Sequence, residues 1–234
     1  MKPYRATPDD PDHHSFVTEM FDRVAPRYDR LNRIMTLGLD VWWRRQLVRS
    51  LDGASHRRVL DVCTGTGDVA LALRQKGHEV IGLDAAPAML ALAREKGDGL
   101  GVRWCRGNCL VLPFGDEAFD AATMCFGIRN IADRTGALRE LRRVVRPGGC
   151  LFVMEVLTPR SGLWGGLVER YERWMVPVLG AVFARQRPAY EYFARSIAGF
   201  GTAREFEREL AQSGWMPLES RRLTGGAVLL FRAT

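Results

Sequence analysis

The chain has 234 residues, of which 47% are hydrophobic and 26% are charged, a balance typical of a folded globular protein rather than a disordered one. Its formal net charge is +7, but the basic residues are spread along the chain without a block of like charges, so we do not expect a nucleic-acid-binding protein. The five cysteines form no C-x-x-C pair, which excludes the usual zinc and disulfide frameworks, and no apolar run is long enough to cross a bilayer.

The first fifty residues divide into a polar tail and an amphipathic segment. Residues 1–13 are rich in proline and aspartate and lack the apolar stretch of a secretory signal. From residue 14 to residue 52, apolar side chains recur at helical spacing, which predicts two or three helices. His13 and His14 belong to the tail, so no histidine is placed as a general base unless the tail folds over the protein.

Short strands and helices alternate between residues 57 and 156. The predicted strands are rich in aliphatic residues, and they span 57–63, 79–84, 102–106, 119–125 and 150–156. The predicted helices between them span 68–75, 87–96 and 133–145, with Pro147–Gly149 ending the last one. This alternation predicts a parallel sheet with helices on both faces.

The alternation stops at residue 157 and resumes at Thr202. The segment 157–200 is rich in aromatic residues, and we interpret it as an inserted helical lid. Thr202 and Glu205 have the spacing of a capping box, which predicts a helix from there to about Gly214. Two further strands, joined by a short glycine link, then predict a hairpin over residues 215–232.

Together these elements predict a single α/β domain over residues 14–234. The sheet is expected to be Rossmann-like, mostly parallel and seven-stranded, with an antiparallel hairpin at the C-terminal end. Class I S-adenosylmethionine-dependent methyltransferases are built in this way. The helices of residues 14–52 and the lid of residues 157–200 are additions to this domain.

The strongest local motif is VLDVCTGTGD at residues 59–68. Gly65 and Gly67 allow the backbone to pass close to a ligand where a strand turns into a helix, although the same glycines also fit a dinucleotide-binding fingerprint. Asp61 favours S-adenosylmethionine, because a carboxylate would repel a pyrophosphate and attract an ammonium and a sulfonium group. The alternative roles for Asp61 are a helix cap and a hydrogen-bond acceptor in the core.

Polar residues also follow the next two strands. Asp84 lies 19 positions after Gly65, close to the spacing of the acidic residue that accepts ribose hydroxyls in nucleotide sites. It could also cap the helix that starts at Pro87. Asn108 follows the third strand, where its amide can recognise an adenine edge or serve as a turn residue.

The fourth strand and its exit loop have the sequence FDAATMCFGIRNI, residues 119–131. Cys125 is expected to face the cofactor, with Arg129 and Asn130 at the mouth of the site, because ligands gather at the carboxyl ends of such strands. Arg129 is either a salt-bridge partner or the group that stabilises an anion, and we favour the second role. No group of residues has the spacing of metal ligands, so no metal is expected.

The sequence resembles the ubiquinone/menaquinone biosynthesis C-methyltransferase family. The resemblance covers nearly the whole chain from about residue 16, and its segments follow the family order. The most specific are VAPRYDRLN at residues 24–32, FGIRNI at 126–131 and LTGG at 223–226. The VLD and GTG elements are shared with many other methyltransferases.

The resemblance implies S-adenosyl-L-methionine as cofactor. The family's cofactor contacts fall on Thr66 in the glycine turn and on Asp84, Asn108, Cys109 and Cys125. Cysteines at positions 109 and 125 replace the more usual alanine and serine, changes small enough to preserve cofactor binding.

The implied reaction is methylation of a ring carbon of a prenylated quinol, most simply of demethylmenaquinol to menaquinol. We predict that Arg129 favours the quinol anion and that Asn130 orients its hydroxyl, with Tyr28 and Asp29 as further candidates for holding or deprotonating the ring. Asp40 stands where the family commonly has histidine. We expect that change on the substrate side, where it leaves the identity of the quinone open.

Other functions remain compatible with the sequence. The acceptor could be the ubiquinone-precursor benzoquinol or another lipophilic phenol, and a non-catalytic S-adenosylmethionine-binding regulator is the alternative from another class. A nicotinamide oxidoreductase is disfavoured by Asp61, and an RNA methyltransferase by the lack of a basic stripe. We expect a cytoplasmic protein; peripheral contact with the inner face of the membrane and a homodimer are both compatible with the sequence.

Overall fold

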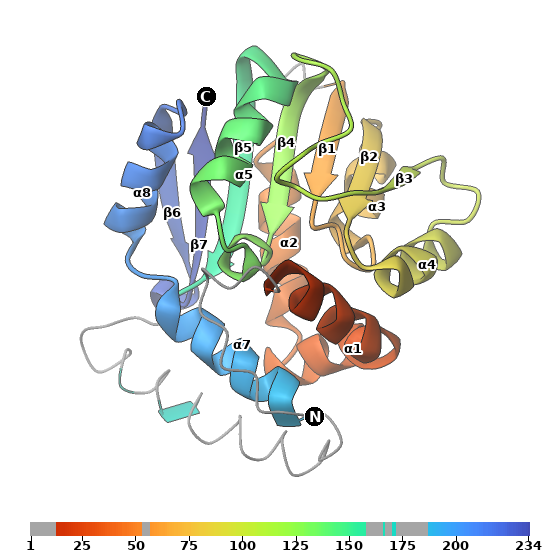
Figure 1. The fold of residues 1–234 in the computed structure, drawn as a ribbon, viewed down its shortest axis with the longest axis vertical. Helices are drawn as coiled ribbons and strands as arrows, with labels where there is room; N and C mark the ends of the chain where they lie inside the picture. Colours follow the sequence, from red (N-terminus) through yellow and green to blue (C-terminus); the bar gives the residue numbers. More distant parts are fainter. Residues whose placement is uncertain (1–12, 53–56, 158–165, 167–169, 172–186) are drawn as a thin grey trace.

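The chain folds around one seven-stranded sheet with the strand order β3-β2-β1-β4-β5-β7-β6 (Figure 1). The computed structural model describes residues 13–52, 57–157, 166, 170–171 and 187–234. The strands are β1 (Arg58–Val62), β2 (Glu79–Asp84), β3 (Arg103–Arg106), β4 (Phe119–Cys125), β5 (Val145–Val156), β6 (Pro217–Leu223) and β7 (Val228–Ala233). β1 to β5 run parallel, and β7 is antiparallel to both β5 and β6. The predicted mostly parallel α/β sheet with an antiparallel C-terminal pair is confirmed.

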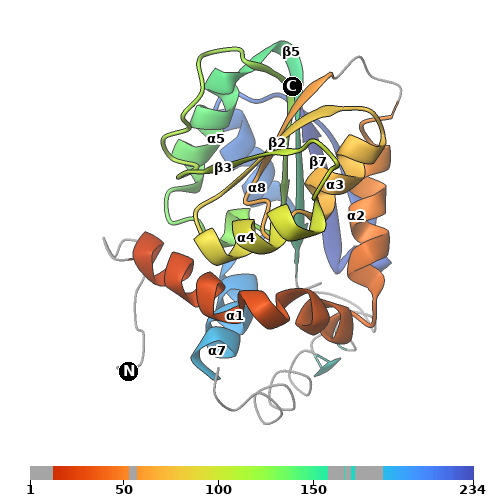
Figure 2. The same cartoon turned by 90° about the vertical axis from the view of Figure 1, so that its right-hand side faces the viewer.

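Helices cover both faces of this sheet. They are α1 (His13–Met35), α2 (Leu39–Arg49), α3 (Asp68–Gln75), α4 (Pro87–Lys96), α5 (Arg134–Val144), α7 (Arg187–Gly199) and α8 (Ala203–Gln212), with the short 3-10 helices η1 (Ile128–Asn130) and η3 (Thr224–Gly226). Figures 1 and 2 show α2 and α3 on one face and α5 and α8 on the other. The capping box of Thr202 and Glu205 is present at the start of α8, as predicted.

β5 begins earlier than the sequence predicts. We expected Pro147–Gly149 to separate the preceding helix from a strand starting at residue 150, but β5 starts at Val145, directly after α5. Val145 pairs with Phe119 while Cys150 pairs with the residue two positions further along β4, so the pairing shifts across this segment. The backbone remains beside β4 through the proline-glycine stretch, a long-range pairing that local residue preferences do not reveal.

Each face of the sheet has its own buried apolar core. Leu138 and Phe206 pack on the face covered by α5 and α8, and Trp43 and Leu73 pack on the face covered by α2 and α3. The Trp43 indole Nε1 donates a 2.7 Å hydrogen bond to the Thr224 hydroxyl. The N-terminal helix α2 is therefore fastened to the link between the last two strands.

α1 lies across the edge of the sheet at which the parallel strands end (Figures 1 and 2). Its residues Val24 and Ala25 pack against Ala86 and Met89 at the start of α4. Ligands of open α/β sheets bind at this edge, so α1 covers the place where a ligand is expected.

The predicted lid over residues 157–200 falls largely outside the described residues. Its described part includes α7, which lies beside α1 below the sheet in both views (Figures 1 and 2). The Tyr171 hydroxyl donates a 2.8 Å hydrogen bond to the Met35 carbonyl at the end of α1. None of the described helices is both long and apolar enough to span a membrane.

Candidate active site

The glycine turn between β1 and α3 has a backbone that only glycine adopts easily. Gly67 has a φ of 85°, and a Cβ there would lie 2.6 Å from the Trp104 ring. Gly65 has a φ of 56°, and the nearest atom to a Cβ there is on the Tyr28 ring, 4.0 Å away. Packing beneath the turn therefore requires Gly67 to lack a side chain, whereas Gly65 is selected by its backbone conformation.

Asp61 serves the core beneath this turn. Only 1% of it is exposed, and its two oxygens accept hydrogen bonds from the hydroxyls of Thr64 at 2.5 Å and Thr123 at 2.6 Å. Burial raises the pKa of Asp61 to about 6. This geometry matches the alternative role considered for Asp61, that of a hydrogen-bond acceptor in the core. Asp61 supports the glycine turn through its hydrogen bond with Thr64, which lies at the start of that turn.

Asp84, at the end of β2, combines two structural contacts with exposure to a cavity. Its oxygens accept the Gly65 N–H at 2.7 Å and the Ala86 N–H at 2.9 Å. Burial raises the pKa of this carboxyl. A carboxylate has about four acceptor positions, so Asp84 can hold the turn and the start of α4 and still accept hydroxyl donors from a ligand.

A cavity lies against the glycine turn at the carboxyl edge of the sheet. Its space, including the mouth, is about 860 Å³. The predicted cofactor residues that line it are Gly65, Asp84, Asn108, Cys109 and Cys125. Asp61, Thr66 and Gly67 are not among the described residues that line it.

The walls of this first cavity offer few polar groups. The Asn108 side-chain oxygen accepts the Leu110 N–H at 2.9 Å, which leaves its amide group as a donor with no partner in the described part of the chain. The Cys125 thiol is neutral at ordinary pH, because burial raises its pKa to about 12. A hydrogen bond to Cys109 and burial raise the pKa of Cys63 as well. These thiols therefore act as apolar wall groups.

A second cavity adjoins the first below η1. It is mainly apolar, with a space of about 510 Å³, and the helices α1 and α7 supply most of its wall. Phe21, Tyr28 and Asn130 line both cavities. A ligand in one cavity can thus approach a ligand in the other where these three side chains lie.

Arg129 lines the second cavity and is held by an ion pair that the sequence analysis did not identify. Its guanidinium donates to the Phe126 carbonyl at 2.9 Å and to Glu155 of β5, and it lies over the Phe193 ring at 4.9 Å. The two paired side chains are almost completely buried, with 3% of Arg129 and none of Glu155 exposed. Both roles considered for Arg129 are therefore compatible: it is an ion-pair member, and its buried Nε has no hydrogen-bond partner among the described residues.

Tyr28 and its neighbour Asp29 point in different directions. Tyr28 lies between the two cavities, and burial raises the pKa of its phenol, which makes it a hydrogen-bond donor rather than a base at neutral pH. Asp29 accepts the Thr66 hydroxyl at 2.6 Å and pairs with Lys96 at 2.7 Å. Asp29 is thus engaged with the glycine turn and α4, and it lines neither cavity in the described structure.

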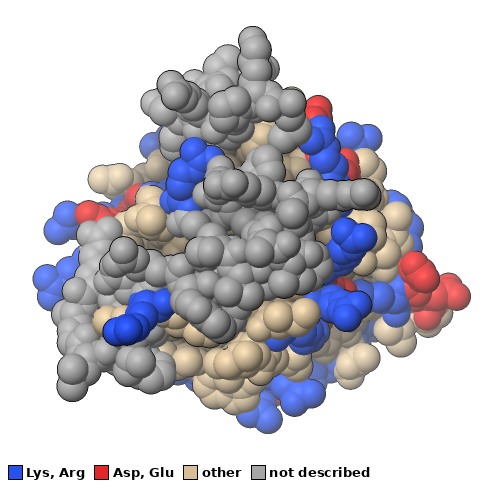
Figure 3. All heavy atoms as spheres, turned by 90° about the horizontal axis from the view of Figure 1, so that it is seen from below, with Lys and Arg blue, Asp and Glu red and all other residues tan. Residues whose placement is uncertain are grey.

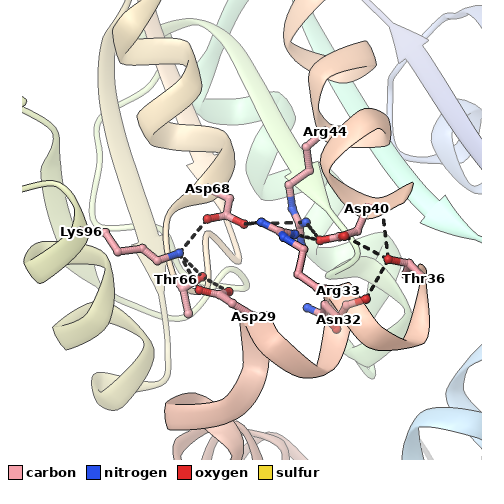
Figure 4. Close-up of polar contacts among 9 residues, drawn as sticks. All are labelled: Asp29, Asn32, Arg33, Thr36, Asp40, Arg44, Thr66, Asp68 and Lys96. Atoms are coloured by element: carbon pink, nitrogen blue, oxygen red, sulfur yellow. Dashed lines mark hydrogen bonds and ion pairs between the residues drawn. The ribbon is translucent and has the colours of Figure 1, made fainter. Parts of the chain in front are cut away.

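These contacts belong to an ion-pair network between α1, α2, α3 and α4 (Figure 4). Lys96 also pairs with Asp68 at 2.7 Å, and Asp68 pairs with Arg33 at 3.2 Å. Burial alone would raise the pKa of Asp68, but the Lys96 hydrogen bond and the nearby arginines lower it. The network fastens the helix that covers the cavities to the turn beneath it.

Asp40 lies at the far end of this network and lines neither cavity in the described structure. It is 1% exposed, and it pairs with Arg33 and Arg44 and accepts the Thr36 hydroxyl at 3.0 Å (Figure 4). The structure thus gives Asp40 a role in joining α1 to α2, and the expectation that its departure from the family pattern touches the substrate stays a prediction. An aspartate suits this position because two arginines neutralise it.

His13 reaches the cavities although the sequence assigns it to a tail. It is the first residue of α1, and His13 and His14 both line the first cavity. The His13 Nε2 donates to the Asn130 carbonyl at 3.1 Å. The start of α1 thus reaches the exit loop of β4, a contact across 117 residues that no local pattern reveals.

A glycine turn after β1, an acidic residue that ends β2 and a cavity above both define the site of a class I methyltransferase. Solved structures share this fold. A SAM-dependent methyltransferase from Thermotoga maritima superposes with a TM-score of 0.65 at 23% identity, covering 93% of this chain and 99% of that one. One from Aquifex aeolicus gives 0.60 at 17% identity and covers 98% of both chains.

Sequence comparison is more specific. The model of the ubiE/COQ5 methyltransferase family matches residues 10–234, and the chain belongs to this family. The demethylmenaquinone methyltransferase of Thermus thermophilus is 43% identical over 84% of this chain and 91% of that protein. The ubiquinone/menaquinone biosynthesis C-methyltransferase UbiE of Geobacter sulfurreducens is 37% identical over 92% of this chain and 86% of that protein.

The chain is thus an S-adenosylmethionine-dependent methyltransferase, and the residues around the first cavity fit that cofactor. Asp84 offers acceptors for ribose hydroxyls, the Asn108 amide is a donor for the adenine, and the walls are otherwise mainly apolar. Gly65 presents no side chain to the ligand. Among the described residues, no cluster of histidine, cysteine and acidic side chains could hold a metal ion.

Proposed function

We propose that this chain methylates a ring carbon of a prenylated quinol, converting demethylmenaquinol to menaquinol. The observation that supports the proposal best is the pair of adjoining cavities. The first has the polar groups that suit the cofactor, and the second is apolar, as an isoprenoid tail requires. The relatives named demethylmenaquinone methyltransferase support the choice of a naphthoquinol over a benzoquinol.

S-adenosylmethionine, when bound, supplies an electrophilic methyl group. The quinol ring lies, in this proposal, where Phe21, Tyr28 and Asn130 line both cavities. Arg129 favours the quinol monoanion, whose charge makes the ring carbon nucleophilic, through its buried Nε donor. Asn130 and the neutral Tyr28 phenol orient the ring hydroxyls, and the ring proton leaves to solvent after methyl transfer.

The roles proposed for the remaining residues follow their positions. Asp84, Asn108, Cys109 and Cys125 contact the cofactor directly. Asp61 and Thr66 support the glycine turn from below and from the side, and Asp29 holds α1 against that turn. Asp29 is therefore a positioning residue in this proposal rather than a proton acceptor.

The test is an anaerobic assay that offers S-adenosylmethionine with reduced demethylmenaquinol or with the demethylated ubiquinol precursor, and with both oxidised quinones as controls. We expect a methylated naphthoquinol by mass spectrometry and no product from either oxidised form. A product from the benzoquinol alone, or from another phenol, would show that this compound, and not demethylmenaquinol, is the methyl acceptor. Cofactor binding without any product would favour the non-catalytic regulator.

A paired variant tests Arg129 without leaving a buried carboxylate unpaired. In Arg129→Met combined with Glu155→Gln, turnover should fall at least about 100-fold, a typical loss for removal of one preorganised donor. S-adenosylmethionine affinity should stay within a factor of about two, because neither residue lines the first cavity. Arg134→Met, which removes another paired arginine that lines neither cavity, is the matched control and should retain turnover.

We also propose that the protein is cytoplasmic and makes peripheral contact with the inner face of the membrane, because a prenylated quinol partitions into the bilayer. Peripheral contact lets the enzyme withdraw a lipid-soluble substrate without spanning the membrane. A homodimer stays a prediction, which sedimentation analysis of the full chain would test.

A further inference from the structure

The turn between α1 and α2 carries an unusual concentration of exposed apolar side chains. Eight large hydrophobic residues are exposed in the described chain, and four of them lie within nine positions here: Ile34, Leu37, Leu39 and Trp42. Leu37, the most exposed of all eight, is 77% accessible. Soluble surfaces rarely gather such residues in one place without a partner.

Arginines flank this apolar turn on both helices. From Pro26 to Arg49 the exposed residues are one proline, the four apolar residues of the turn, and four arginines: Arg27, Arg30, Arg45 and Arg49. Helical spacing places Arg30 one turn before Ile34 on α1, and Arg45 one turn after Trp42 on α2. The exposed surface of this segment therefore has an apolar centre, cationic flanks and no acidic residue.

None of these four arginines pairs with a carboxylate in the part of the chain that the structure describes. Arg33 and Arg44, on the inner side of the same helices, instead pair with buried acids. Figure 3 shows lysine and arginine distributed over this end of the molecule, with acidic residues mainly at its edge. The outward arginines are available to an anionic partner.

The backbone at Leu37 gives an independent reason to look for a function. Leu37 has a φ of 52°, in the left-handed region that glycine and asparagine adopt easily and leucine does not. An exposed leucine in that conformation contributes nothing to the core and strains the turn. Folding alone does not account for this side chain.

We propose that this apolar, arginine-flanked turn docks on an anionic lipid membrane. Tryptophan and aliphatic side chains enter the interfacial region of a bilayer, while arginines bind anionic headgroups. A nucleic acid would use the arginines but not the four apolar side chains at their centre. The inference rests on the proposed function, because it identifies where the lipid-soluble substrate reaches the enzyme.

The turn also lies next to the cavity assigned to the substrate. Leu31, Asn32 and Met35, in the last turns of α1, line the second cavity, and the exposed residues Ile34 and Leu37 belong to the same short segment. Docking through this turn would bring the wall of the apolar cavity to the membrane surface. A prenyl tail could then pass into the cavity with little exposure to water.

Vesicle flotation of the full chain tests the proposal. Vesicles of equal parts phosphatidylglycerol and phosphatidylcholine should bind the protein, and vesicles of phosphatidylcholine alone should bind it far more weakly. Arg30→Gln with Arg45→Gln should weaken binding to the anionic vesicles about 30-fold. Raising the salt concentration should weaken wild-type binding as well.

Leu37→Asn separates docking from folding. Asparagine suits the left-handed backbone, so the variant should be at least as stable as wild type, yet it should bind anionic vesicles about tenfold more weakly because one apolar side chain is lost. Leu218→Gln and Arg103→Gln are the matched controls. Both residues are exposed near the amino ends of β6 and β3, at the opposite end of the sheet from α1.

Failure of wild type to float with anionic vesicles would overturn the proposal, as would equal losses in the turn and control variants. Arginine-dependent binding of a short DNA duplex without vesicle binding would also overturn it. Each variant is assayed in addition with a short-tailed quinol in solution, where we expect wild-type turnover. If every protein, wild type included, lacks that turnover, the proposed function fails whatever the vesicles show.

Discussion

Replacing Glu155 by glutamine should reveal how much stability the protein loses when the buried Arg129, which lines the second cavity, has no carboxylate partner. Arg129 is 3% exposed and Glu155 is fully buried, so the positive charge of the guanidinium depends on this carboxylate for its neutralisation. Removing one partner of a buried ion pair typically costs 3–5 kcal/mol, because the other charge is left uncompensated. Since glutamine keeps the shape and can accept one hydrogen bond, we expect about 3 kcal/mol, near the lower limit.

Thermal unfolding followed by circular dichroism measures this loss. For a chain of this size, 1 kcal/mol corresponds to about 2–4 °C, so the melting temperature should fall by roughly 6–12 °C. Glu19→Gln is the matched control, because it breaks a Glu–Arg pair whose side chains are more than half exposed. Exposed pairs contribute less than about 1 kcal/mol.

The double variant separates charge compensation from packing. Arg129→Met added to Glu155→Gln removes the buried cation as well, so much of the lost stability should return although catalysis does not. If Glu155→Gln melts within about 2 °C of wild type, the reasoning that Arg129 depends on Glu155 is refuted.

Three further changes probe the region around the glycine turn. Gly67→Ala should destabilise the protein by at least about 2 kcal/mol in urea unfolding, because its Cβ would lie 2.6 Å from Trp104 and its φ of 85° disfavours alanine; a neutral effect would contradict the packing described. Asp61 has a native pKa of about 6, raised above its unfolded value of 3.8, so the native state binds its proton more tightly and wild type loses up to about 3 kcal/mol of stability as pH rises from 4 to 7. The Asp61→Asn variant should lack that pH-dependent loss of stability. If the free energies of unfolding of the two proteins change with pH in the same way between pH 4 and 7, Asp61 makes no such contribution. Lys96→Met removes the cation that holds Asp29 and should raise the dissociation rate of S-adenosylmethionine about fivefold in stopped-flow measurements, whereas an unchanged rate would show that α1 does not control exchange.

The sequence predicts the elements of the sheet well because their signals are local. Strands β2 and β4 and helices α3 and α4 have the bounds expected from aliphatic runs, from Pro87 and from the glycine turn. The start of β5 at Val145 was missed, since it depends on pairing with Phe119. Composition and spacing say nothing about such a partner.

The sequence predicts which residues line the site better than it predicts the residues with which they form ion pairs and hydrogen bonds. Asp84, Asn108 and Cys125 line the cavity, as expected from strands that end at one edge of a sheet. The Arg129–Glu155 pair joins residues 26 positions apart on different elements, so only the fold reveals it. The sequence feature that could have pointed to Glu155 is its position as an acidic residue near the end of a predicted apolar strand.

The contacts of α2 with residues far along the chain have a consequence for folding during synthesis. α2 is complete once the first fifty residues have been made, but Trp43 bonds to Thr224 and packs with Val228 and Leu230 near the other end of the chain. Part of this face meets α3 earlier, through Leu73, but the part that packs on β7 and η3 has no partner until residues 224–230 have been made. During translation, the side of α2 that faces the C-terminal hairpin therefore stays unprotected until that hairpin packs against it.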